Sequence, residues 1–187
     1  EWNSGSGITG GEAVLVPYVT FTAEGEQKFS MTFNNGFNLA EEEYFEYSVG
    51  NGDWKRFTET VSDVAFGGSK GSLRLRGKSS QGTATNTVDY STISFGNDTE
   101  VSCKGDIRTL IDYKNYANAP TANARFYRLF WRCNVLTTAP DLPATELARN
   151  CYGFMFYHCQ ALTEAPELPA TTLSYMCYEE MFDSCIS

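Results

Sequence analysis

Hydrophobic and polar residues repeat at a fixed interval of 26 in the last third of the chain. The sequence Phe-Trp-Arg-Cys at residues 130–133 returns as Phe-Tyr-His-Cys at 156–159 and as Phe-Asp-Ser-Cys at 182–185. The proline-containing stretch 139–145 likewise returns as 165–171. A constant period of this length is typical of stacked repeats, in which each unit buries its apolar face against a neighbour.

Comparison of the two complete copies separates an inner face from an outer one. Leu147, Cys151 and Met155 stand four residues apart and recur unchanged 26 residues later. Spacing of four places side chains on one face of a helix, so this pattern predicts a helix with its fixed face inward. The positions that differ between copies, and that we expect to face outward, are Glu146, Arg149, Asn150 and Gly153.

Each repeat is therefore expected to be a leucine-rich-repeat-like unit of strand, bend and helix. Residues 136–139 and 162–165 predict short strands, each ended by a proline that cannot donate to a ladder. Thr145 and Thr171 occupy the expected N-cap positions of the two helices. The amphipathic stretch 106–114 predicts a short helix that caps the open first coil.

Upstream of the repeats, the pattern changes to a period of two. Residues 28–34 alternate apolar and polar side chains, and the Asn-Gly pair at 51–52 lies between two aromatic-rich runs, which predicts a hairpin. Short strands separated by Gly-rich turns indicate an antiparallel β-sandwich. The predicted strands are residues 15–23, 28–34, 45–49, 54–57, 72–76, 91–95 and 100–103.

The predicted fold class is α+β, mainly β: an antiparallel sandwich at residues 13–103, then a cap helix and a short solenoid at 104–187. Residues 1–12, which are rich in Gly and Ser, are expected to form a flexible leader. The third repeat copy stops at Ser187, before its strand. We therefore expect an array truncated at its C-terminus, whose open last repeat favours weak homodimerisation.

Composition narrows the class of partner. The chain has 187 residues, of which 42% are hydrophobic and 20% charged, as in a globular protein. The net charge of −9 argues against nucleic acid or an anionic membrane as partner. No apolar run reaches the length of a membrane span.

Five of the six cysteines belong to the repeat pattern. Cysteines that recur once per coil stack along a solenoid, and free cysteine is readily buried, so we predict buried thiols. No pair has the C-x₂₋₄-C spacing of a zinc site. Cys103 lies outside the pattern, and the sequence does not decide whether it forms a disulfide. The two series are Cys133, Cys159 and Cys185, and Cys151 and Cys177.

No catalytic or metal-binding constellation is predicted. His158 is the only histidine, and Arg132 and Ser184 occupy its position in the other copies, which indicates a solvated site. The Glu run at 41–43 lacks the spacing of a calcium loop, and the Gly-rich residues 67–72 lack that of a phosphate loop. We expect no enzyme activity, no cofactor and no metal.

Aromatic residues are the remaining candidates for binding. Trp54, Trp131, Tyr157 and Tyr175 lie near predicted turns or at positions that vary between repeats. Exposed aromatic rings stack on sugars or anchor a protein partner. The alternative interpretation is that these rings pack inside two small cores.

The repeat motif at residues 126–187 resembles the BspA-like leucine-rich-repeat surface proteins of gut and oral bacteria. The motif reads Leu-Thr-Thr-Ala-Pro-Asp-Leu-Pro-Ala-Thr from residue 136, followed by Cys-Tyr, Met-Phe and Cys. Scattered positions of the β-rich segment, among them residues 18–23, 46–48, 52–54 and 105–107, resemble the module that precedes such arrays. The resemblance implies a secreted or surface-anchored protein that acts in adhesion and has no catalytic residues.

The expected function is therefore non-catalytic binding at the cell surface or outside the cell. The repeats would present a regular face to a host or bacterial surface protein or to a glycan. The alternative is a carbohydrate-binding module in the β-sandwich, with the repeats as a spacer.

Inward and outward positions of the repeat are expected to differ in their contribution to stability. Replacing Leu147 with alanine removes buried methyl groups and should lower the free energy of unfolding by about 2–5 kcal/mol. Glu146→Ala, one residue away, should change it by less than about 0.5 kcal/mol. Urea unfolding of both variants measures the difference, and equal losses would contradict the assignment of inner and outer faces.

Overall fold

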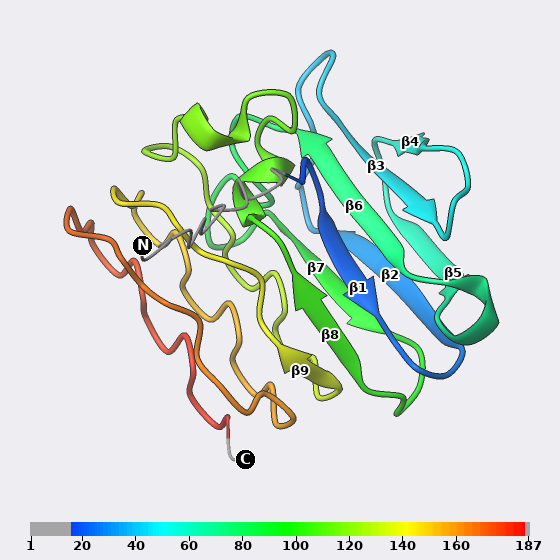
Figure 1. Ribbon diagram of the computed structural model, residues 1–187. Coiled ribbons are helices and arrows are strands. Elements are labelled where there is room, and N and C mark those ends of the chain that lie inside the picture. The colour runs from blue at the N-terminus through cyan, green and yellow to red at the C-terminus, as the bar shows by residue number, and fades with distance from the viewer. Residues whose placement is uncertain (1–15, 186–187) are drawn as a thin grey trace, which may run out of the picture.

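The computed structural model describes residues 16–185, and the predicted leader at 1–12 lies outside them. Two β-sheets face one another across a shared core (Figure 1). Sheet A has the strand order β4-β3-β6-β1-β8-β9, and sheet B the order β5-β2-β7. The strands are β1 (Val19–Thr22), β2 (Gln27–Asn34), β3 (Tyr44–Val49), β4 (Lys55–Phe57), β5 (Val61–Phe66), β6 (Leu73–Lys78), β7 (Tyr90–Phe95), β8 (Val101–Lys104) and β9 (Leu136–Thr138).

Most of the predicted strands form where period two is clear. The hairpin at the Asn-Gly pair is confirmed, since β3 and β4 pair antiparallel and the Gly52 amide donates to the Val49 carbonyl over 2.9 Å. Strand β5 was not predicted. Its regular alternation is broken at Asp63, which has a φ of 56°, and its pairing with β2 shifts register between Phe29 and Met31.

Aromatic side chains from alternate strand positions fill the space between the sheets. Phe21 of β1 contacts Phe29 and Phe95 of sheet B with ring centroids 5.8 and 5.6 Å apart. Phe21 and Phe29 are fully buried. Because successive side chains of a strand point to opposite faces, these inward rings leave the other face of sheet A to polar and charged residues.

Both sheets continue directly into the repeats. In sheet A, β8 pairs in parallel with β9 of the first coil. On the side of sheet B, the Ile93 amide donates to the Leu129 carbonyl over 2.7 Å. The rings of Phe21 and Phe130 lie 6.2 Å apart within one cluster of buried residues. The sandwich itself therefore covers the apolar edge of the first coil.

The cap helix predicted at residues 106–114 is reduced to a single short turn. A 3-10 helix, η2 (Ile107–Leu110), buries Ile107 and Leu110 beside the first coil, and Asp106 caps it by accepting the Arg108 amide. Two further 3-10 turns, η1 (Gly68–Lys70) and η3 (Tyr116–Asn118), occur in the described chain.

The predicted solenoid of strand–bend–helix units is wrong. The described residues are mainly β and contain no helix of seven or more residues, so Thr145 and Thr171 cap no helix. Only the first of the two predicted strands forms, as β9, while residues 162–165 are not a strand. Within each coil, every fourth residue has a positive φ, which interrupts a right-handed helix. These residues are Arg128 and Arg132, then Asn150, Phe154 and His158, then Met176, Glu180 and Ser184.

We call residues 126–133, 148–159 and 174–185 the turn ribbon, and its amides alternate between two kinds of acceptor. The Tyr152 amide donates to Cys177 of the next coil over 2.9 Å, whereas the Met155 amide turns back to Tyr152 over 3.1 Å. The same alternation runs along the first two segments, whereas the amide hydrogen bonds described for the third, such as that from Met181 to Tyr178, all close turns within it. In an α-helix, all of these amides would donate to carbonyls of the same coil. In the first two segments every second donor bonds to the next coil instead, and these bonds between coils take the place of the helical ones.

Identical residues stack in register inside this ribbon. The rings of Phe130, Phe156 and Phe182 are spaced 5.6 Å apart at interplanar angles of 6° and 8°. Leu147 and Met155 are buried as predicted, and Glu146 and Arg149 are exposed. Asn150 and Gly153, which were expected to face outward, are buried instead, because the turns of the ribbon do not follow a helical surface.

The thiols are structural groups of these stacks. All six cysteines are free, which includes Cys103, and all but Cys185 are buried. The Cys159 thiol donates to the Phe130 carbonyl of the preceding coil over 3.0 Å, and Cys185 repeats this bond to Phe156 over 3.0 Å. Burial raises the pKa of Cys133 and of Cys151 from 9.0 to about 12. The predicted burial of the repeat cysteines is confirmed for four of the five.

A glycine substitution distinguishes the turn ribbon from a helix. Glu180 is exposed and has a φ of 44°, so Glu180→Gly should raise the free energy of unfolding by about 0.5–1 kcal/mol. Glu146 is also exposed and lies outside the positive-φ set, so Glu146→Gly should lower it by about 0.5–1 kcal/mol. In a helix both variants would be destabilised by about 1 kcal/mol. Urea unfolding measures the sign.

Buried thiols should be unreactive, and their burial should make stability depend on alkaline pH. In native protein at pH 8 we expect slow reaction with an aromatic disulfide, and rapid reaction in denaturant. A thiol whose folded pKa is raised stabilises the fold fully below pH 9.0, and this contribution falls as pH rises toward about 12. The Cys151→Ala variant should lose part of that slope, which is about 1.4 kcal/mol per pH unit for each thiol. Rapid labelling of these thiols in the native protein would contradict their assignment as buried groups.

Candidate functional site

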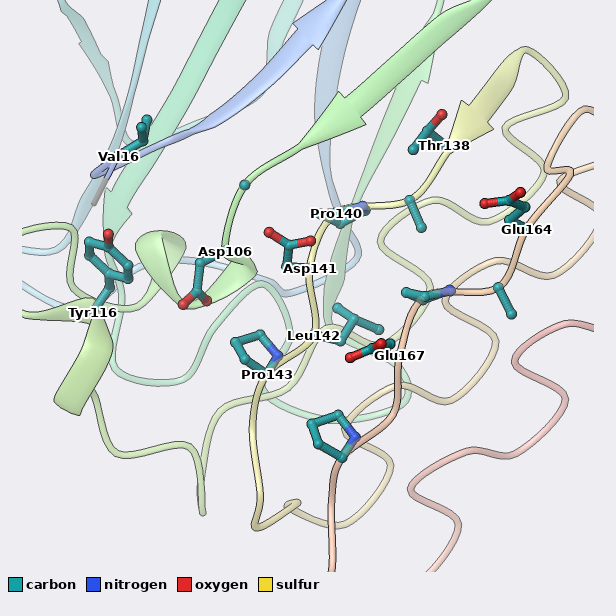
Figure 2. Close-up of a pocket in the computed structure, with 15 residues that line it drawn as sticks. Val16, Asp106, Tyr116, Thr138, Pro140, Asp141, Leu142, Pro143, Glu164 and Glu167 are labelled. Atoms are coloured by element: carbon teal, nitrogen blue, oxygen red, sulfur yellow. The ribbon is translucent and has the colours of Figure 1, made fainter. Parts of the chain in front are cut away.

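A groove of about 620 Å³ opens where the proline-rich segments of the repeats lie beside the end of β8 (Figure 2). We call it the acidic groove. Its walls come from residues 105–106, from residues 138–143 of the first coil and from residues 164–169 of the second, with Val16 and Tyr116 at one end. Figure 2 shows Asp106, Asp141 and Glu167 on these three segments in turn.

The groove forms because the proline-rich segments do not pair. The first two walls are joined, since the Asp141 amide donates to Gly105 over 2.9 Å and the Ile107 amide donates to Asp141 over 3.1 Å. Between residues 138–143 and 164–169, by contrast, no backbone hydrogen bond occurs in the described structure. Each of these two segments carries two prolines, which have no N–H to give to a ladder.

The groove is negatively charged. Asp106 is held by Arg108, whose Nη2 lies 2.6 Å from the carboxylate, and this hydrogen bond raises the pKa of the guanidinium. Asp141, Glu164 and Glu167 have no ion-pair partner within the described part of the chain. Three carboxylates on two of the walls therefore remain uncompensated, beside prolines and alanines.

The chemistry offered by this lining is that of a hydrogen-bond acceptor. Carboxylates and backbone carbonyls accept, prolines contribute no amide, and the lining contains neither histidine nor cysteine. Among the described residues, no three His, Cys, Asp or Glu side chains gather closely enough to hold a metal ion. The groove is thus built to receive donors such as ammonium or guanidinium groups.

The four aromatic residues singled out in the sequence do not form one site. Trp131 and Tyr157 occupy the same position of consecutive coils on the outer side of the turn ribbon, where the Arg132 amide donates to Tyr157 over 2.7 Å. Tyr175 is 60% exposed and carries the Arg149 guanidinium 4.8 Å from its ring centroid. Trp54 lies on the outer face of sheet A, and none of the four lines the acidic groove.

Trp131 belongs to a cluster of aromatic rings of this chain that surround Arg128. The guanidinium carbon of Arg128 lies 5.1–5.5 Å from four ring centroids, and its Nη1 donates to the Tyr90 hydroxyl over 3.2 Å. The Nε atom is buried without a partner. This cluster covers the outer side of the junction between sheet B and the first coil. Its rings are Tyr90, Tyr127, Trp131 and Phe154.

Sequence reasoning missed the groove, although one signal for it was present. Asp141 and Glu167 are both acidic, stand at the same repeat position and are flanked by prolines in both copies. That both copies keep a carboxylate where the ladder is interrupted indicates an exposed charge that repeats with the coil. Glu164, whose counterpart is Thr138, carries no such signal.

Comparison with known proteins adds no assignment to this geometry. Helices of the length and hydropathy needed to cross a membrane are absent from residues 16–185. A scan against protein-family models, a search of curated proteins and a search of solved structures each find no match to the chain.

Proposed function

We propose that the chain is a non-catalytic binding protein that acts in adhesion and holds a positively charged segment of a protein partner in the acidic groove. The observation that carries this proposal is the groove itself, a hollow of about 620 Å³ lined by three uncompensated carboxylates. A cavity of this size accommodates a few side chains of an extended segment. The placement at the cell surface is supported by the resemblance of the repeat motif to BspA-like surface proteins.

The lining favours a basic protein segment over a neutral one. A carboxylate only accepts hydrogen bonds, and Lys and Arg side chains only donate them, so a basic segment matches the carboxylates of the groove in both charge and hydrogen bonding. The rings of Pro140, Pro143 and Pro169 add flat apolar walls that can cover the aliphatic stems of those side chains. Charge complementarity of this kind also accelerates association.

The regular spacing of the coils supports an extended partner. Asp141 and Glu167 stand at one repeat position on neighbouring segments, and Asp106 precedes them on a third. A segment that lies across the two coils meets Asp141 on the first and Glu164 and Glu167 on the second. The repeats thereby present a periodic face, which is the property expected of a binding solenoid.

Neutralising the groove should weaken the binding of a basic peptide. For the double variant Asp141→Asn/Glu167→Gln, we expect the Kd of a fluorescent oligo-lysine peptide to rise about tenfold, because two close charge pairs are lost. Fluorescence anisotropy at physiological salt measures the change. Asp141 and Glu167 are exposed, so the fold should be retained, which circular dichroism checks.

A matched variant separates the groove from the overall negative charge. Glu41 and Glu42 are exposed in a loop outside the groove, and Glu41→Gln/Glu42→Gln changes the net charge by the same amount. This control should shift the Kd less than about twofold, as expected for screened distant charges. Equal losses in both double variants, or no binding of the peptide, would refute the groove as a site.

A further inference from the structure

The outer face of sheet A concentrates positive charge on an otherwise acidic chain. Five of the 14 Lys and Arg residues lie at its outward strand positions, whereas the net charge of the protein is −9. Glu46 stands among them, paired across the strands with two arginines, and Asp112 is bridged to Lys78. We call this surface the arginine face, made of Arg56, Arg74, Arg76, Lys78 and Lys104.

Aromatic rings, together with Glu46, hold the guanidinium groups of this face in place. The Arg76 carbon lies 3.8 Å from the Trp54 centroid and 4.0 Å from that of Tyr113, so the guanidinium is sandwiched between two rings. Arg56 lies 3.6 Å over Tyr44. Such stacking fixes the orientation of a guanidinium and leaves its in-plane N–H donors free.

The charge of these arginines is only partly compensated. Glu46 serves two of them, at 2.8 Å from Arg76 Nε and 3.8 Å from Arg56 Nε. The terminal nitrogens of Arg76 and Arg56 have no hydrogen-bond acceptor among the described residues, and Arg74 uses one of its own on the Ser48 hydroxyl at 2.7 Å. Fixed donors without acceptors form a preorganised receptor for anions, since a guanidinium matches a carboxylate or a sulfate with two parallel hydrogen bonds.

The cations stand in rows that cross the strands. Pairing places Ser48, Arg74, Thr20 and Lys104 side by side on β3, β6, β1 and β8, and places Arg56, Glu46 and Arg76 in the row beside them. Alternate positions of one strand are roughly 7 Å apart, and every second strand is roughly 10 Å away. Several anionic groups of one chain can therefore be engaged at once, which raises avidity.

We propose that the arginine face binds an anionic polysaccharide, one whose sugars carry carboxylate or sulfate groups. The backbone groups of the inner strands of sheet A are paired with one another, so this face offers side chains alone. A peptide lying on it would find donors for its C=O groups in the guanidinium groups but no backbone carbonyls to accept from its N–H groups. A polysaccharide has no such groups, and its charged substituents meet the guanidinium forks while its ring faces contact the aromatic edges. This site is independent of the acidic groove.

Binding of defined polyanions tests the inference. Isothermal titration of the whole chain should show binding of heparin oligosaccharides, as the sulfated probe, or of polygalacturonate oligosaccharides, as the carboxylated probe, and none of neutral dextran. The probe that binds with the lower Kd shows whether the guanidinium groups prefer sulfate or carboxylate. Affinity should fall with rising salt, because exposed charges are screened. Poly-glutamate or a DNA duplex that binds as tightly as both glycans would overturn the polysaccharide assignment.

Matched charge variants locate the site. Arg56 and Lys104 are exposed, so Arg56→Gln/Lys104→Gln should keep the fold and raise the glycan Kd about tenfold. Lys28→Gln/Lys70→Gln removes two exposed charges that lie off this face and should change it less than about twofold. Arg76→Lys keeps the charge but loses the fork, and should weaken binding several-fold. Equal losses in the two double variants, or binding to no glycan, would overturn the proposal.

The proposals for the groove and for the arginine face can be refuted independently of each other. The Asp141→Asn/Glu167→Gln variant should bind the glycan at least as tightly as the unmodified chain, because it removes negative charge elsewhere. Arg56→Gln/Lys104→Gln should bind the oligo-lysine peptide undiminished. Loss of glycan binding in the groove variant would contradict the assignment to sheet A.

Discussion

The structure of the repeats depends on how the backbone amides of the turn ribbon are shared. In the first two segments every second amide donates to the next coil, as Tyr152 does to Cys177, and the intervening amides close tight turns within the coil. The geometry requires a positive φ at every fourth residue, which costs about 1–2 kcal/mol for each L-residue. The arrangement persists because the same bonds bring identical rings such as Phe130 and Phe156 into parallel contact at 5.6 Å.

The hydrogen bonds between coils begin at the sandwich and are interrupted at the proline-rich segments, and these two places define the junction with the sheets and the acidic groove. At the first coil, the unpaired edges are taken up by the two sheets, through β8 on one side and Ile93 on the other. On the proline-rich side, residues that lack an N–H leave two neighbouring segments unjoined, and the acidic groove opens there. The surface that we propose for binding thus lies where two neighbouring segments share no backbone hydrogen bond.

Charge is divided between two surfaces in a way that the net value of −9 conceals. Three of the four carboxylates of the groove have no cationic partner in the described chain, and the outer face of sheet A gathers guanidinium groups that are stacked on Trp54, Tyr113 and Tyr44. Exclusion of anionic partners from net charge alone applies to the average surface and not to this face. Two sites of opposite sign would suit a protein that joins a basic protein partner to an anionic glycan.

The sequence by itself determined the repeat period, the inward positions of Leu147, Cys151 and Met155, and most strands of the sandwich, because burial constrains residue type locally. It did not determine the backbone of the repeat. Spacing of four satisfies both a helix and a four-residue turn, although a helix would rotate the stripe by about 40° at each step from Leu147 to Cys159. The choice was made by hydrogen bonds to residues 25 positions away, such as that from Phe156 to Met181. The grouping of Asp141 with Glu167, and of Arg76 with Trp54 and Tyr113, likewise required the tertiary structure, because strand pairing and coil stacking bring these residues together from distant parts of the chain.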